Sequence, residues 1–214
     1  MSQGTLFATQ GESLPIVDGE LTYYRHWLSQ AEAQQLLVVL RQQVQWQQST
    51  IVLYGKPVKI PRLNAWYGDA GCDYHYSGHQ FAPHPWLPCL EVLRHKLQTV
   101  TGKAFNSVLV NCYRDGNDSV AWHSDDEPEL GRNPLVASIS LGAERSFQLR
   151  HRYHPQGSQR KLTLEHGSLL IMAGELQHHW QHQLPKTAKQ VGERINLTYR
   201  YVISPEQGRM PPEQ

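Results

Sequence analysis

One histidine and four acidic residues fall within the segment AWHSDDEPEL, residues 121–130. His123 and Asp125 are two positions apart, so on an extended segment both side chains project from the same side. An imidazole and a carboxylate in this arrangement can bind one metal ion, although a solvated acidic loop has the same composition. The segment therefore predicts part of a metal site and requires a second histidine from elsewhere.

The segment QHHWQHQLP, residues 177–185, offers this second histidine. His178, His179 and His182 are the candidates, and the pattern leaves the choice among them open. Two histidines and one carboxylate form the facial triad of non-haem Fe(II) oxygenases, which leaves coordination positions open for substrate and dioxygen.

A third segment, RINLTYRYV, carries two arginines on one side of an expected strand. The polar face of this strand would consist of Arg194, Asn196, Thr198 and Arg200. Because a guanidinium binds a carboxylate through two parallel hydrogen bonds, this face suits a dicarboxylate; an ordinary amphipathic strand is the alternative. Asn111 and Tyr113 in VLVNCY likewise share a face and can donate hydrogen bonds to an acid.

Two helices and a run of strands must position these side chains. Ser29 and Glu32 form a capping-box signal for a helix over about 29–43, and a second helix is expected over about 88–101, ended by Gly102. From residue 106 onward the chain consists of short β-like runs separated by turn residues: SVLVNCY, LVASISL, SFQLRH, KLTLEH, SLLIMA and RINLTYRYV. The pattern predicts an α+β fold, mainly β, in which the helices cover one face of a sandwich or barrel.

The composition restricts the class of protein. The 214 residues are 39% hydrophobic, which suits one domain, and the formal net charge of +1 gives no global attraction to nucleic acid or anionic membrane. Cys72, Cys89 and Cys112 are too few and too widely spaced for a disulfide framework or a Cys-rich zinc site. With no signal-like N-terminus and no long apolar run, we expect a cytoplasmic protein that does not associate with membranes.

Positive charge is concentrated in one local segment, residues 145–161. Its basic residues are Arg145, Arg150, Arg152, Arg160 and Lys161, together with His151 and His154. This patch is suited to phosphate contacts, and a solvated hairpin is the alternative.

Taken together, the order Asn-x-Tyr, His-x-Asp, His, Arg-x-Asn-x-Thr-x-Arg resembles the AlkB family of Fe(II)- and 2-oxoglutarate-dependent dioxygenases, most closely the subgroup that repairs alkylated double-stranded DNA. The similarity extends from about Tyr54 to Tyr201, through GKPVKIPRLNAWYGDAG, YSG, FNSVLVNCYRDGNDSVAWHSDDE, HGSLLIM, HHWQHQLP and RINLTYR. It implies a double-stranded β-helix, or jelly roll, with N-terminal helices and a nucleotide-recognition lid. A single domain, 1–214, would hold the helices and recognition region at about 12–104, the catalytic core at 105–203, and tails at 1–11 and 205–214.

The resemblance also implies the ligands of the cofactors Fe(II) and 2-oxoglutarate, with O2 as the oxidant. The metal ligands would be His123, Asp125 and His182. The 2-oxoglutarate site would consist of Asn111, Tyr113, Arg194, Asn196, Thr198 and Arg200. Within it, Arg200 would bind the distal carboxylate, and Arg194 would lie closer to the metal-side carboxylate.

The substrate contacts follow from the same resemblance. Asp126 would be a catalytic and substrate-reading acid in the lesion pocket that also orients Arg194, and Arg62 would lie near that pocket. Tyr74, Tyr76 and Ser77 would clamp a flipped base, since a base inside a duplex cannot reach an enclosed iron. Tyr54, before Gly55, would be the wedge that fills the gap left by that base, while Glu127 and Glu129 are expected in a solvated loop.

The implied activity is oxidative demethylation of 1-methyladenine and 3-methylcytosine in DNA, with duplex DNA as the expected partner and a monomer as the expected state. The methyl group would be released as formaldehyde, which leaves the repaired base, and 2-oxoglutarate would be converted to succinate. The alternatives are an RNA demethylase with the same chemistry and a catalytically silent nucleic-acid-binding module on the same fold.

Overall fold

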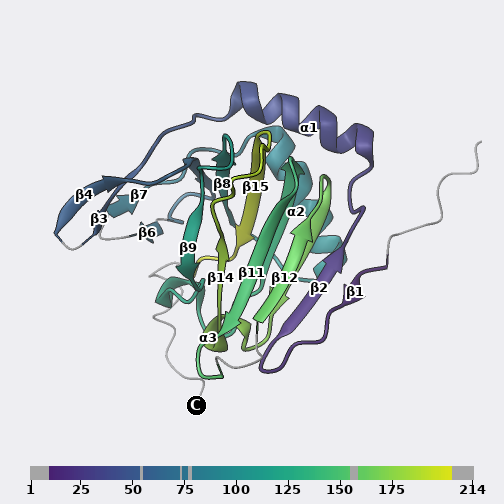
Figure 1. Ribbon diagram of the computed structural model, residues 1–214. Helices are drawn as coiled ribbons and strands as arrows, with labels where there is room; N and C mark the ends of the chain where they lie inside the picture. Colours follow the sequence, from purple (N-terminus) through teal and green to yellow (C-terminus); the bar gives the residue numbers. More distant parts are fainter. Residues whose placement is uncertain (1–9, 54, 73, 77–78, 155–158, 204–214) are drawn as a thin grey trace, which may run out of the picture.

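Two antiparallel sheets pack face to face in the computed structural model, which describes residues 10–53, 55–72, 74–76, 79–154 and 159–203 (Figure 1). The seven-stranded sheet has the order β1 (Glu12–Ser13), β2 (Glu20–Tyr24), β13 (Ser168–Ala173), β10 (Val136–Gly142), β15 (Arg194–Arg200), β8 (Ser107–Tyr113), β5 (Leu63–Gly68). The four-stranded sheet has the order β12 (Gln159–Leu164), β11 (Arg145–His151), β14 (Trp180–Leu184), β9 (Val120–His123). The predicted α+β jelly-roll architecture, mainly β, is confirmed.

Two small hairpins lie at one side of this sandwich, next to β9 (Figure 1). They are β3 (Thr50–Leu53) with β4 (Lys56–Lys59), and β6 (Tyr74–Tyr76) with β7 (His79–Phe81). Val52 and Val58 of the first hairpin are exposed, so this hairpin presents apolar side chains to its surroundings.

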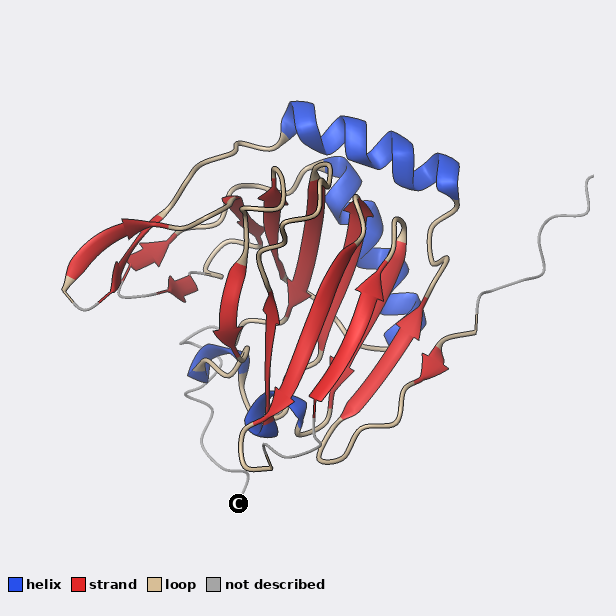
Figure 2. Cartoon of the chain, viewed as in Figure 1, coloured by secondary structure: helices blue, strands red, loops and turns tan. Residues whose placement is uncertain are grey.

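Both predicted long helices are present and cover the outer face of the seven-stranded sheet (Figure 2). In α1 (Gln30–Gln43) the capping box is formed reciprocally: the Ser29 side chain accepts from the Glu32 backbone, and the Glu32 side chain accepts from the Ser29 backbone. Helix α2 (Pro88–Thr101) ends at Gly102, whose φ of 66° is in the left-handed region. A short helix, α3 (Leu176–His179), and a 3₁₀ turn, Pro128–Leu130, complete the helical part.

Alternation along β15 decides what lies on each side of the larger sheet. Ile195, Leu197 and Tyr199 face the helices and are fully buried, and each such side chain contributes about 1.5–3 kcal/mol of hydrophobic stabilisation. The intervening polar residues face the space between the sheets. The same strand thus stabilises the fold on one face and lines the interior with hydrogen-bonding groups on the other.

The described part of the first seventy residues contributes strands as well as helix α1. β2 pairs with β13, and β5 pairs with β8, so both strands belong to the seven-stranded sheet. No helix among the described residues is long and apolar enough to cross a membrane.

Candidate active site

A cavity between the two sheets collects most of the polar residues singled out from the sequence. The predicted residues that line it are Arg62, Asn111, Tyr113, His123, Asp125, His182, Arg194, Asn196, Thr198 and Arg200. Apolar side chains, among them Leu109, Phe147 and Leu184, complete the wall.

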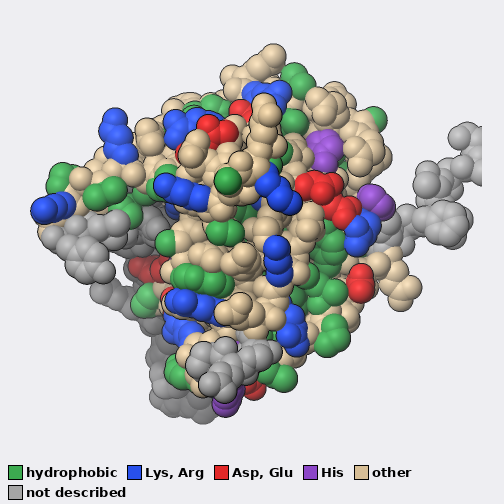
Figure 3. Space-filling view, in the orientation of Figure 1, with side chains coloured by type: hydrophobic (Ala, Val, Ile, Leu, Met, Phe, Trp, Pro, Cys, Tyr) green, Lys and Arg blue, Asp and Glu red, His purple; other side chains and the backbone are tan. Residues whose placement is uncertain are grey.

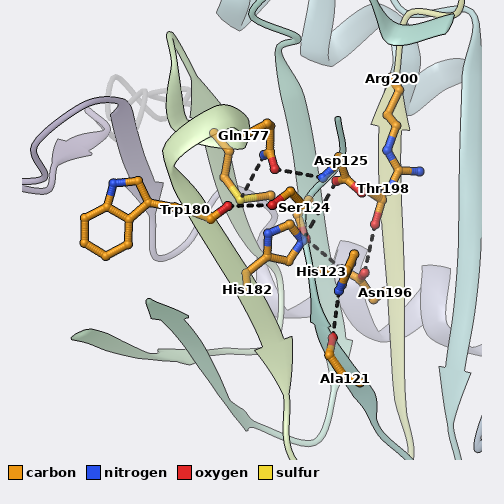
Figure 4. A network of polar contacts seen from close by, with 12 residues as sticks. Ala121, His123, Ser124, Asp125, Gln177, Trp180, His182, Asn196, Thr198 and Arg200 are labelled. Atoms are coloured by element: carbon orange, nitrogen blue, oxygen red, sulfur yellow. Dashed lines mark hydrogen bonds and ion pairs between the residues drawn. The ribbon is translucent and has the colours of Figure 1, made fainter. Parts of the chain in front are cut away.

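The three predicted metal ligands converge at one end of this cavity (Figure 4). One potential ligand atom from each of His123, Asp125 and His182 lies within 4.8 Å of the other two. The β9–β14 pairing places His123 directly opposite His182, and their ring centroids are 4.2 Å apart. The register between β9 and β14 therefore brings the two histidines together.

The rival histidines lie elsewhere, on α3. His178 Nε2 is 3.0 Å from Asn133 Oδ1, and His179 Nε2 is 3.5 Å from Glu175 Oε2. The structure thus selects His182 from the three candidates.

The backbone selects the tautomer of His123. Its Nδ1 lies 2.8 Å from the Ala121 carbonyl oxygen, which can only accept a hydrogen bond. Nδ1 must therefore hold the hydrogen, and Nε2 keeps a lone pair for a metal.

Asp125 is buried beside Arg200, whose Nη2 donates to Oδ1 at 2.7 Å. Burial would raise the pKa of this carboxyl group, but the Arg200 guanidinium and the two imidazoles outweigh burial and lower it to about 2. The second oxygen, Oδ2, is buried without a hydrogen-bond partner among the described residues and lies 3.9 Å from His182 Nε2. Asp125 is therefore ionised and has one carboxylate oxygen, Oδ2, that a metal ion could bind.

His182 is the buried member of the pair of histidines. Burial lowers the pKa of its imidazole to about 3, and the neighbouring His123 contributes in the same direction. A metal ligand must be neutral imidazole, and His182 is neutral at physiological pH.

The far end of the cavity is formed by Arg194. Its Nη2 donates to Ser140 Oγ at 2.9 Å, its guanidinium lies 5.3 Å from the Tyr113 ring centroid, and its buried Nε has no hydrogen-bond partner among the described residues. Burial lowers the pKa of Arg194 to about 10, which leaves it charged at neutral pH. A buried cation with an unused donor is suited to an anionic group.

The two arginines of β15 are therefore assigned opposite ends from those predicted. Arg200 contacts Asp125 and belongs to the metal end, whereas Arg194 lies at the end away from it. The prediction that Arg200 binds the distal carboxylate is wrong, because alternation shows which face a residue occupies but not which end of the strand meets the metal ligands.

Hydrogen bonds between side chains hold the middle of this polar face. Thr198 Oγ1 donates to Asn196 Oδ1 at 3.0 Å, and Asn196 Nδ2 donates to Ser138 Oγ at 2.8 Å. Nearby, Arg62, which immediately precedes β5, donates from Nε to Oδ1 of Asn111 in β8 at 2.9 Å, and both side chains are buried.

The two acids after Asp125 lie in the opposite positions from those predicted. Asp126 is exposed, does not line the cavity and accepts from Arg152 Nη2 at 2.8 Å, so the prediction that it lies in the pocket and orients Arg194 is wrong. Glu127 lines the cavity and has a buried Oε2, so its placement in a solvated loop is also wrong. The chain leaves the strand geometry after His123, and simple alternation no longer applies there.

Some predicted base contacts cannot be placed. Tyr54 and Ser77 lie outside the described residues. Tyr74 and Tyr76 belong to β6, but their side chains are also outside the described part of the protein.

The basic segment separates into buried and exposed members. Arg145 is buried and donates to the carbonyls of Asp115, Asp118 and Pro185, so its assignment to a phosphate-binding patch is wrong. Arg152, His154, Arg160 and Lys161 are exposed, and Arg150 is partly exposed.

A second group with metal-ligand residue types comprises Asp18, His151 and His179. His151 Nδ1 accepts from the backbone N–H groups of Tyr153 and His154, each at 3.1 Å, so its hydrogen lies on Nε2 and is donated to Asp18 at 3.0 Å. Because both nitrogens are engaged, His151 joins the loop at Asp18 to β11 and has no free lone pair for a metal.

Comparison with known proteins adds an independent finding. The model of the 2OG-Fe(II) oxygenase superfamily matches residues 20–200. The chain is 42% identical over 193 residues to human alpha-ketoglutarate-dependent dioxygenase alkB homolog 3, covering 86% of this chain and 67% of that protein. It is 39% identical over 189 residues to human DNA oxidative demethylase ALKBH2, covering 84% of this chain and 72% of that protein.

The chain thus spans about two thirds of the length of these relatives. Among solved structures, OsALKBH1 superposes with a TM-score of 0.63 at 17% identity, covering 88% of this chain and 100% of that chain. At this identity the likeness supports the fold alone.

Proposed function

The chain belongs to the 2OG-Fe(II) oxygenase superfamily and, within it, to the AlkB homologues, and on this basis we propose that it is an oxidative demethylase of N-alkylated bases in DNA. The proposed substrates are 1-methyladenine and 3-methylcytosine. The observation that carries this function is the cavity with His123, Asp125 and His182 at one end and the buried Arg194 at the other.

The three side chains fit Fe(II), the metal of the family. His123 and His182 are neutral donors, Asp125 is ionised, and Asp125 Oδ2 is buried with no hydrogen bond among the described residues. Two imidazoles and one carboxylate hold such a metal on one face and leave the other face open.

The dicarboxylate 2-oxoglutarate fits the polar face of β15. Arg194, Ser140 and Tyr113 would hold the carboxylate farther from the metal through charge-assisted hydrogen bonds. Bound Fe(II), 2-oxoglutarate and O2 supply the oxidising power that hydroxylates an N-methyl group, which then leaves as formaldehyde, with succinate and carbon dioxide as coproducts.

The protein's own residues prepare and protect this chemistry. Arg200 keeps Asp125 ionised and orients its carboxylate, while the Ala121 carbonyl orients His123. Apolar lining such as Leu109 and Phe147 limits the access of water.

Glu127 and Arg62 are the charged side chains proposed to contact the methylated base. Both line the cavity, and Arg62 is fixed by its hydrogen bond to Asn111. A carboxylate accepts hydrogen bonds from the exocyclic amino groups of adenine and cytosine and favours the positive charge that methylation introduces. In this proposal, Glu127 takes the role that the family resemblance implied for Asp126.

The substrate would reach the cavity past the two hairpins beside β9. The hairpin β3–β4 carries Lys56 and Lys59 together with exposed valines, and Tyr54, which lies between these strands in the sequence, is the proposed wedge in duplex DNA. Tyr74, Tyr76 and Ser77 remain the proposed clamp on the flipped base. The protein is proposed to act as a monomer.

Phosphate contacts are proposed along the exposed face of the four-stranded sheet. Figure 3 shows Lys and Arg side chains spread over the face that Figure 1 labels β14, β11 and β12. Arg150 of β11 lies with its guanidinium 4.4 Å from the Trp122 ring centroid, and Lys161 of β12 is exposed. Binding through such groups weakens as salt increases.

The test is incubation of the protein with Fe(II), 2-oxoglutarate and air-saturated buffer. Matched single-stranded DNA, duplex DNA and RNA oligonucleotides, each with one 1-methyladenine or 3-methylcytosine, are then analysed for mass loss and formaldehyde. Demethylation of DNA supports the function, and a preference for the duplex supports the wedge. Demethylation of RNA alone would overturn the DNA assignment.

The control separates catalysis from binding. Asp125→Ala should abolish turnover while leaving oligonucleotide affinity near that of the unmodified protein, because Asp125 is buried in the metal site. Retained turnover in Asp125→Ala would show that the assigned metal site is not the catalytic one.

A further inference from the structure

Gln177 is the first residue of the segment QHHWQHQLP but was given no role from the sequence, and it is fully buried next to Asp125. We propose that Gln177 is a positioning residue that fixes the backbone of Asp125 and thereby the geometry of the metal centre. Its role rests on the proposed function, because it takes His123, Asp125 and His182 as the Fe(II) ligands.

The backbone of Asp125 has no strand partner. β9 ends at His123, so Asp125 lies beyond the last ladder position, although it is only 2% exposed. Its N–H instead donates to Gln177 Oε1 at 2.9 Å (Figure 4). A buried backbone donor requires such a partner, and here a side chain provides it.

The side chain that holds the Asp125 backbone comes from the chain segment that also carries His182. Gln177 is in α3, which leads directly into β14 and His182. A second hydrogen bond joins the same two segments: Ser124 Oγ donates to the Trp180 carbonyl oxygen at 2.8 Å. The loop with one metal ligand is therefore attached to the segment with another at two consecutive residues.

The Gln177 side chain is itself held in place. Its Nε2 lies 3.8 Å from Met172 Sδ, so the amide is oriented with its oxygen toward Asp125. Gln177 holds the backbone of Asp125, and Arg200 holds carboxylate oxygen Oδ1. Together they leave Oδ2 facing the His182 side.

Two substitutions distinguish hydrogen bonding from packing. Gln177→Met keeps the length of the side chain but removes the acceptor, whereas Gln177→Glu keeps an acceptor oxygen. If Gln177 only fills space, methionine should be tolerated better than a buried carboxylate. If it positions Asp125, glutamate should be the better replacement.

The readout is Co(II) binding to the metal-free protein, followed by the visible absorption of the bound ion. Loss of a residue that supports a metal ligand typically weakens metal affinity about 10- to 100-fold, and we expect this for Gln177→Met together with an altered Co(II) spectrum. Gln177→Glu should restore the spectrum of the unmodified protein. Circular dichroism checks that each variant is folded.

Gln148→Met is the matched control, because it makes the same chemical change on β11, where Gln148 Oε1 accepts from Gln183 at 2.8 Å. Its Co(II) affinity and spectrum should be unchanged. If Gln177→Met binds Co(II) with the same affinity and the same visible spectrum as the unmodified protein, the positioning role is overturned. Failure of the unmodified protein to bind Co(II) would instead overturn the metal site on which the proposed function depends.

Discussion

The buried pair of Arg200 and Asp125 leads to a quantitative prediction about stability. Replacing Arg200 by methionine removes the donor that lies 2.7 Å from Asp125 Oδ1 and leaves a carboxylate that is 2% exposed. Removing one partner of a buried ion pair costs about 3–5 kcal/mol in the free energy of unfolding. For a domain of this size the melting temperature should fall by roughly 6 to 20 °C.

The pH dependence of this loss has a defined sign. In the unmodified protein the pKa of Asp125 is lowered to about 2, so its contribution to stability is present above the ordinary carboxyl pKa of about 3.9 and is lost as the pH falls toward 2. Arg200 is the largest of the influences that oppose burial, so without it Asp125 should take up a proton in the folded state at a higher pH than in the unmodified protein. The difference in stability between the two proteins should therefore shrink as the pH is lowered from neutrality.

The assay is thermal unfolding of the metal-free proteins, repeated with Co(II). The metal supplies a positive charge beside Asp125, so it should stabilise Arg200→Met more than the unmodified protein. Lys96→Met is the control, because Lys96 and Glu32 form a pair at 2.9 Å with side chains 46% and 51% exposed, and such surface pairs contribute at most about 1 kcal/mol. If the metal-free Arg200→Met and Lys96→Met proteins have the same melting temperature, the role assigned to the buried pair is refuted.

Three further outcomes test the rest of the site. Arg194→Met should raise the KM for 2-oxoglutarate about 10- to 100-fold, since a hydrogen bond to a charged group contributes about 1.5–3 kcal/mol, and steady-state kinetics that show no change would contradict the assignment. Tyr54→Ala should reduce turnover of duplex DNA more than that of single-stranded DNA, and equal losses would eliminate the wedge. Arg150→Gln and Lys161→Gln should each reduce the slope of log affinity against log salt by about 1, measured by fluorescence anisotropy between about 50 and 200 mM salt. Lys103→Gln, an exposed site just beyond α2, should leave that slope unchanged.

Local sequence patterns were sufficient to predict the two long helices, the strands of the core and the residue types that make up the candidate site. The capping box at Ser29 and the glycine at 102 set the ends of the two long helices through hydrogen bonds and backbone angles formed within a few residues. The alternation along β15 separated the helix-facing residues from the cavity-facing ones, and β8 follows the predicted run SVLVNCY. These features depend on neighbours in the chain, and they are therefore readable from the chain alone.

Other features depend on contacts between distant segments. The pairing of β9 with β14 selects His182 over His178 and His179, and the contact with Asp125 places Arg200, not Arg194, at the metal end. Neither choice follows from periodicity, since a period of two residues is unchanged when a strand slides by two or reverses its direction.

Local sequence patterns also could not predict which charged residues are buried. Arg145 belongs by composition to a basic patch, but it is buried where backbone carbonyls from two loops, those of Asp115 and Asp118 and that of Pro185, converge on its guanidinium. Glu127 and Asp126 are adjacent and chemically alike, and only the path of the loop after His123 sends one into the cavity and the other to Arg152 at the surface. Residue type and spacing thus specify which groups are present, whereas the packing of the two sheets specifies which of them meet.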